Sequence, residues 1–156
     1  MMRVLLLLFS LQSIVGFSQL KSYDIESIPE LQKNEPRPVV VFLYADWCRY
    51  CKAMENTTFK KQDIVEKLNN DFYFVRFDGE QRESVTLGEK IYNFKPSGNE
   101  TGMHELAMAL GTIEGQVNYP TLVVVNERFD ILYQYAGYMK TQEVETLLSI
   151  VIEKGL

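Results

Sequence analysis

Two cysteines separated by two residues directly follow a continuous apolar run. The segment YADWCRYCKAM, residues 44–54, holds Cys48 and Cys51, the only cysteines of the chain. Such a pair is typical of a catalytic dithiol, a metal clip, a haem attachment point or a structural disulfide. A structural disulfide stabilises most when it closes a long loop, and a bridge across two residues closes almost none. The spacing therefore argues against a purely structural role.

The residues around the pair narrow the choice among the remaining three roles. Haem attachment needs a histidine directly after the second cysteine, and Lys52 stands there instead. Zinc needs a full tetrahedral set of ligands, whereas the chain adds to its cysteines only one histidine, His104, which we expect at the surface. Copper(I) accepts two thiolates, and methionines are available as further ligands. A catalytic dithiol and a copper(I) site both stay open on the residues alone.

The N-terminus has the pattern of a secretory signal peptide. Arg3 precedes the apolar residues 4–9, and small residues follow at Gly16 and Ser18, so we expect cleavage after about Ser18. Removal of Arg3, the one charge in this leader, changes the formal net charge from −5 to −6. This acidic balance, without a Lys/Arg cluster, argues against nucleic-acid binding. We expect an exported protein, periplasmic if bacterial and otherwise secreted, in a compartment that favours disulfides.

The remaining residues, 19–156, have the length of one domain. Apolar runs rich in β-branched and aromatic residues predict strands at 37–45, 72–79, 119–126 and 131–137, the last two antiparallel to each other. Amphipathic patterns predict helices at 23–35, 48–59, 61–72, 104–111 and 141–154. Residues 84–94 are interpreted as a further helix and residues 95–102 as a loop.

This order, with Cys-x-x-Cys where the first core strand gives way to a helix, resembles the thioredoxin superfamily from about Val39 to the C-terminus. The residues that carry the resemblance are ADWCRYCK at 45–52, NYPT at 118–121 and Gly137. The stretch FLYADWCRYCKAMENTTF is similar to exported thioredoxin-like reductases, including the C-terminal thioredoxin domain of DsbD-type transmembrane reductant carriers. The resemblance implies an α/β fold, with a central mixed β-sheet flanked by helices, and thiol-disulfide exchange without a cofactor.

The two cysteines are expected to have different roles. Cys48 stands at a helix N-terminus, where unpaired amides and the helix dipole lower the pKa of a thiol, so it is the expected nucleophile. Cys51, one turn further and more buried, is the expected resolving cysteine. Between them, Arg49 and Tyr50 are candidates for tuning the dithiol, although Arg49 can equally be a solvated surface residue.

The resemblance implies that three further residues belong to the site. Trp47, the only tryptophan, is expected to shelter the sulfurs at the rim of the site, with a plain core aromatic as the alternative. The Tyr119–Pro120 peptide bond is expected to be cis and to face the cysteines. The backbone of Tyr119 would then be offered to a substrate strand.

The chain departs from the thioredoxin pattern in two respects. Many thioredoxins carry a buried aspartate six residues before the first cysteine, accompanied by a lysine on the next strand, but Phe42 occupies this position and the strand FYFVRF has no lysine. Asp46 and Glu55 are nearer the cysteines and are candidates for proton transfer, but each is more simply interpreted as a helix cap or a solvated helix charge. Residues 80–102 also exceed what a minimal thioredoxin needs.

Taken together, the residues and the resemblance predict a monomeric, exported thiol-disulfide oxidoreductase. Its expected partners are proteins with disulfides or thiols, and a membrane reductant carrier is the candidate electron donor. The Arg-Tyr pair between the cysteines differs from the Pro-His and Gly-His pairs usual in strong exported oxidants, so reduction is the expected direction. The alternative is a copper(I)-binding or non-catalytic thioredoxin-like binding module.

Overall fold

The computed structural model describes residues 18–155, so the expected leader lies, apart from Ser18, outside the described residues. A four-stranded sheet with the order β2-β1-β7-β8 forms its centre. Its strands are β1 (Val39–Tyr44), β2 (Tyr73–Asp78), β7 (Thr121–Val125) and β8 (Ile131–Ala136). β1 pairs with β2 in parallel and with β7 antiparallel, and β7 pairs antiparallel with β8, so the sheet is mixed as predicted.

The continuous apolar run that predicted β1 reflects burial on both faces of the sheet. Val40 and Phe42 belong to one core cluster, while Val39, Val41 and Leu43 belong to another on the opposite face. Successive side chains of a strand point to opposite faces, so only a strand covered on both sides needs every residue to be apolar.

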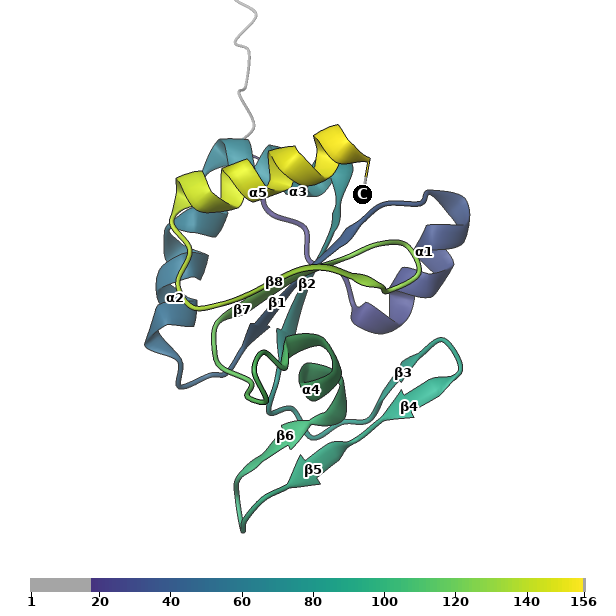
Figure 1. Ribbon diagram of the computed structural model, residues 1–156, viewed down its shortest axis with the longest axis vertical. Helices are drawn as coiled ribbons and strands as arrows, with labels where there is room; N and C mark the ends of the chain where they lie inside the picture. Colours follow the sequence, from purple (N-terminus) through teal and green to yellow (C-terminus); the bar gives the residue numbers. More distant parts are fainter. Residues whose placement is uncertain (1–17, 156) are drawn as a thin grey trace, which may run out of the picture.

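Helices cover both faces (Figure 1). The cluster that contains Phe42 is closed by α2 (Arg49–Asn56), α3 (Gln62–Asp71) and α5 (Thr141–Lys154). The other cluster is closed by η1 (Ile25–Ser27), α1 (Ile28–Asn34) and α4 (Glu105–Gly111). The helices predicted at 48–59 and 61–72 are present as α2 and α3, with the short η2 (Thr58–Lys60) between them.

The segment predicted as a helix at residues 84–94 is instead built from strands. It forms the hairpin of β3 (Val85–Leu87) and β4 (Lys90–Tyr92), followed by a second hairpin of β5 (Phe94–Pro96) and β6 (Gly102–His104). The first hairpin turns at Gly88 with φ +64°, a value that glycine adopts readily at the first position of a tight turn. In Figure 1 the first hairpin lies to the right of α4 and the second lies below it, at the lower end of the molecule.

His104 also differs from the expectation of a surface residue, because its side chain is fully buried. Its ring packs edge-on against Phe77, with centroids 5.2 Å apart, and its Nε2 lies 3.1 Å from the carbonyl oxygen of Glu83. Its Nδ1 accepts the backbone N–H of Leu106 at 3.2 Å, which makes His104 the N-cap of α4. The ring therefore joins the segment that holds the two hairpins to the core.

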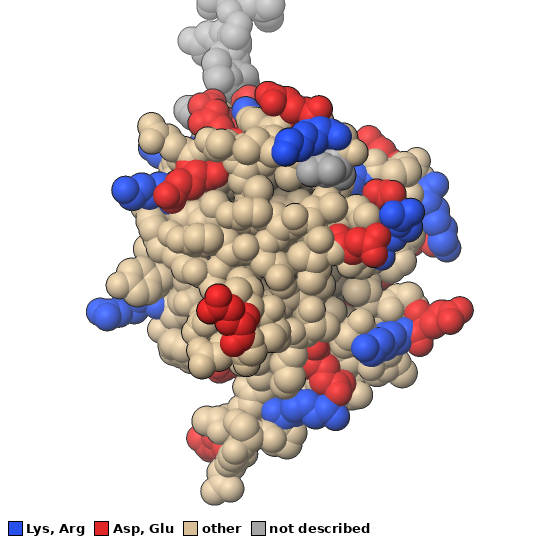
Figure 2. Space-filling model, in the orientation of Figure 1, with Lys and Arg blue, Asp and Glu red and all other residues tan. Residues whose placement is uncertain are grey.

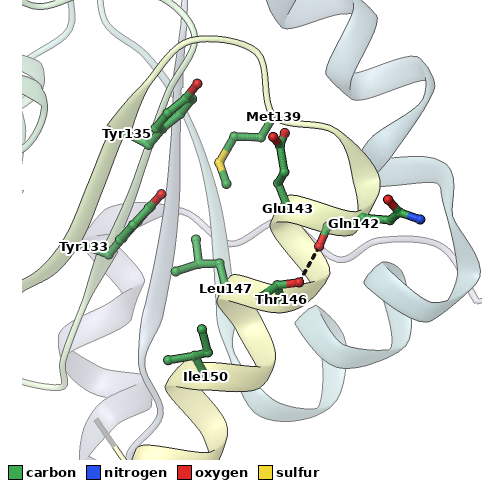
Figure 3. A pocket seen from close by; sticks show the side chains of 8 residues that line it. All are labelled: Tyr133, Tyr135, Met139, Gln142, Glu143, Thr146, Leu147 and Ile150. Atoms are coloured by element: carbon green, nitrogen blue, oxygen red, sulfur yellow. Dashed lines mark hydrogen bonds between the residues drawn. The ribbon is translucent and has the colours of Figure 1, made fainter.

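On the face shown in Figure 2, charged side chains gather mainly at the margins, and a largely uncharged area crosses the middle, where β8 runs in Figure 1. A hollow of about 390 Å³ lies between β8 and α5. Figure 3 shows Tyr133 and Tyr135 of β8 facing Leu147 and Ile150 of α5 across it. None of the site residues predicted from the sequence lines this hollow. Within residues 18–155, no helix has the length and apolar character needed to cross a membrane.

Candidate active site

The two cysteines lie where β1 gives way to α2. Cys48 is the N-cap of α2 in an extended conformation, with φ −74° and ψ 106°, and Cys51 is in the first turn. Their sulfurs form a disulfide, with Cα atoms 5.3 Å apart. Asp46, a candidate cap on the sequence, is not the cap, because the sulfur of Cys48 itself accepts the backbone N–H of Cys51 at 3.1 Å.

This hydrogen bond favours negative charge on the sulfur of Cys48. An N–H aimed at a sulfur stabilises the thiolate over the thiol, as does the positive end of the helix dipole. In the oxidised pair both residues are nearly inaccessible, Cys48 at 3% exposure and Cys51 at 1%. Cys51 is the more buried, as expected, but the difference is small. The amide contact therefore distinguishes the two sulfurs more clearly than exposure does.

The residues between and before the cysteines form an exposed surface. Tyr50 is 64% exposed, Arg49 is exposed, and Trp47 is 68% exposed. Trp47 is thus no core aromatic. Its Nε1–H donates to Oε2 of Glu80 at 3.1 Å, and its ring meets that of Tyr119 edge-on, with centroids 6.1 Å apart.

The Tyr119–Pro120 peptide bond is cis, as the resemblance implied. Thr121, the next residue, lies opposite Leu43 in the antiparallel pairing of β7 with β1. The cis bond and the cysteine loop are therefore at the same end of the sheet.

The side chain of Tyr119 occupies a constrained position. Its ring lies so close to Gly79 that a side chain at residue 79 would overlap it. Its hydroxyl is buried and has no hydrogen-bond partner within the described residues. Burial raises the pKa of Tyr119 above its ordinary value, and the carboxylates of Glu80 and Asp78 raise it further.

At the position of the thioredoxin aspartate, Phe42 is fully buried and pairs in register with Arg76 on β2. Arg76 forms an ion pair with Glu55 of α2, and its guanidinium lies 3.8 Å from the ring centroid of Tyr44. The strand that supplies the lysine in many thioredoxins thus carries a cation, Arg76. Its partner is the helix carboxylate of Glu55, because the position of the buried aspartate is occupied by Phe42. Glu55 is accordingly a partly exposed ion-pair partner.

Sequence reasoning identified the dithiol, Trp47 and the cis-proline peptide, but missed Gly79 and Glu80. Glu80 follows Trp47 by 33 residues, and nothing in the local pattern around it indicated a contact with an aromatic ring. The Asp-Gly pair at the end of β2 was the available signal, because a glycine there permits a large side chain to approach the backbone. Within the described part of the chain, no group of three or more His, Cys, Asp or Glu side chains is placed to hold a metal ion.

This arrangement is that of the thioredoxin-like thiol-disulfide oxidoreductases. The chain belongs to the family described as "Thioredoxin-like domain", whose profile matches residues 26–152. Over 57 residues it is 37% identical to the thiol:disulfide interchange protein DsbD of Escherichia coli, an alignment that covers 36% of this chain and 10% of that protein. The chain thus spans about a tenth of the length of this relative.

Solved structures share the fold at low sequence identity. A thioredoxin from Thermus thermophilus superposes with a TM-score of 0.62 at 18% identity, covering 88% of this chain and 91% of that one. The oxidoreductase DsbH gives 0.58 at 17% identity, covering 85% and 87%. The C-terminal domain of Neisseria meningitidis DsbD in its reduced form gives 0.52 at 18% identity, covering 80% and 90%.

Proposed function

We propose that the protein is an exported enzyme that reduces disulfides of other proteins through Cys48 and Cys51. One observation carries the assignment of roles: the sulfur of Cys48 caps α2 and accepts the N–H of Cys51 at 3.1 Å, while the two sulfurs are close enough to be bonded. Cleavage of a leader comprising residues 1–18, with residues 19–156 as a single domain, belongs to the same proposal.

The proposed reaction is two consecutive thiol-disulfide exchanges. The Cys48 thiolate attacks one sulfur of the partner's disulfide, whose S–S bond breaks, and the second partner sulfur leaves and takes up a proton. Cys51 then loses its proton and attacks the sulfur of Cys48. The mixed disulfide breaks and the first partner sulfur leaves as a thiol. Two electrons have passed to the partner, and the Cys48–Cys51 disulfide has formed.

A dithiol donor must reduce this disulfide again before the next cycle, and we propose a membrane-bound reductant carrier. Similarity to a protein named a thiol:disulfide interchange protein supports an exchange partner of this kind. The residues between the cysteines, Arg49 and Tyr50, support the reducing direction, because they differ from the pairs usual in strong exported oxidants.

The surrounding residues have supporting roles in this proposal. Trp47 and the Tyr119–Pro120 backbone contact the substrate segment, and Arg49 and Tyr50 tune the dithiol. The exposure of Trp47 and the position of the cis bond at the same end of the sheet as the dithiol support these roles.

The reduction potential of the purified Cys48–Cys51 pair tests the direction. A value near that of thioredoxin, about −270 mV, supports a reductant, whereas a value near that of a strong oxidant, about −120 mV, contradicts it. Export is tested separately by the mass of the protein recovered outside the cytoplasm. Loss of residues 1–18 supports the leader, and an intact chain found only in the cytoplasm refutes export.

A further inference from the structure

One side of the dithiol carries two carboxylates and an exposed indole held in place. The carboxylate of Glu80 accepts the Nε1–H of Trp47 at 3.1 Å, and the carboxylate of Asp78 accepts the backbone N–H of Glu80 at 2.9 Å. The ring of Tyr119 packs edge-on against the indole. Trp47 therefore has a defined position although 68% of it is exposed.

Within the part of the chain that the structure describes, no ion pair neutralises the charge of Asp78 or Glu80. The ion pairs there neutralise other carboxylates. Both carboxylates nevertheless lie near the dithiol, because Gly79, the residue between them, lies against the ring of Tyr119, the residue before the cis-proline. Asp78 also pairs in register with Tyr44, the last residue of β1 before the cysteine loop.

These residues adjoin the reacting sulfurs through the chain itself. Trp47 is bonded directly to Cys48, and Tyr119 directly to Pro120. Carboxylates beside an exposed indole face suit a Lys or Arg side chain, which gains both Coulomb attraction and a cation–π contact.

We propose that Asp78, Glu80 and Trp47 form a subsite for a basic side chain next to the partner's disulfide. The enzyme therefore selects protein disulfides flanked by Lys or Arg. This inference rests on the proposed reductase function and adds the substrate class to it.

Glu80 could instead serve only to orient Trp47, and glutamine separates the two roles. The side-chain oxygen of Glu80→Gln can still accept the indole N–H, but the charge is lost. Glu80→Ala loses both. Glu127→Gln is the matched control, because Glu127 is exposed and follows β7 at the end of the strand opposite to Pro120.

The test measures rate constants for reduction of three model peptides that are identical except for Lys, Ser or Glu on both sides of their disulfide. Fluorescence of Trp47, the only tryptophan, reports the reaction. For wild type we expect the Lys peptide to react about threefold faster than the Ser peptide, and the Glu peptide to react more slowly still, as Coulomb attraction across roughly 8 Å of water implies.

The preference should shrink at high salt. It should also shrink in Glu80→Gln, where Asp78 keeps its charge, and stay at its wild-type size in Glu127→Gln. Equal rates for the three peptides with wild type overturn the inference, and so does an unchanged preference in Glu80→Gln. If wild type reduces the Ser peptide without preference, the proposed function stands and only the subsite is refuted. If it reduces none of the peptides, the proposed function fails and the subsite with it.

Discussion

The ring of Tyr119 lies directly against the backbone of Gly79, so the residue before the cis-proline touches the point where β2 leads into the inserted hairpins. The contact links three segments that are distant in sequence, because Trp47 packs against the same ring. The position of the exposed indole therefore depends on a glycine outside the Cys-x-x-Cys motif.

Replacing Gly79 with alanine should displace Tyr119 and, through it, Trp47. Overpacking of this kind costs about 1–3 kcal/mol. We expect the free energy of unfolding in denaturant to fall by that amount, with a changed fluorescence of Trp47 in the folded state. The double variant Gly79→Ala/Tyr119→Ala provides the space, so its two substitutions should cost less than the sum of their separate effects. Strict additivity would contradict the contact.

Replacing Tyr119 with phenylalanine should leave the stability unchanged or raise it by up to about 1 kcal/mol. The hydroxyl is buried without a hydrogen-bond partner among the described residues, and removing an unsatisfied polar group avoids its desolvation cost. Chemical denaturation of both proteins checks this expectation. A loss of more than about 1 kcal/mol would mean that the hydroxyl has a partner in solution.

Replacing Cys51 with serine should trap partner proteins. Cys48 can still attack a disulfide, but nothing displaces the partner from the mixed disulfide, so covalent adducts should accumulate and vanish on reduction. Non-reducing gels of the protein from its native compartment, followed by mass spectrometry, identify the adducts. Cys48→Ser is the control and should lose both turnover and trapping. Equal trapping by Cys48→Ser would refute the assignment of attacker and resolver.

In the reduced protein, a small alkylating agent at about pH 7 should modify Cys48 well before Cys51. The sulfur of Cys48 receives the N–H of Cys51, whereas Cys51 lies inside the first turn of α2. Peptide mapping after short labelling times gives the order. Labelling of Cys51 first, or of both at the same rate, would count against the proposed nucleophile.

The stability of the protein should fall as the pH drops below the ordinary pKa of histidine, 6.5. Burial lowers the pKa of His104, opposed by the Glu83 carbonyl and the charge of Glu105. The unfolded chain then binds a proton that the folded state resists, so the contribution is fully present above 6.5 and is lost as the pH falls towards the lowered pKa of the folded state.

Unfolding curves at several pH values test this dependence, with His104→Asn as the comparison. Asparagine can still accept the N–H of Leu106 as an N-cap, but it does not titrate. Its stability should therefore change less with pH over the same range. An identical slope in the two proteins would show that other groups cause the dependence.

The sequence alone determined the central sheet and the position of the dithiol. β1 could be predicted because a strand buried on both faces needs an unbroken apolar run, and Cys48 and Cys51 follow that strand directly. The cis peptide at Pro120 depended on the resemblance, since an X–Pro pair by itself is cis in only about 5–6% of cases. Each of these features lies within a short run of consecutive residues, so a local pattern or motif is sufficient to predict it.

Tertiary structure alone decided the inserted hairpins and the surroundings of Trp47. The segment at residues 84–94 has no strong local period, and its strands depend on distant partners, such as Glu26, whose carboxylate accepts the N–H of Thr86. His104 was predicted at the surface, but its side chain is buried and contacts the carbonyl of Glu83, in the segment before the hairpins. Glu80 meets Trp47 only because β2 ends beside the cysteine loop. A contact between residues 33 positions apart, such as that of Trp47 with Glu80, produces no periodic pattern in the sequence, because it forms only when separate elements pack together.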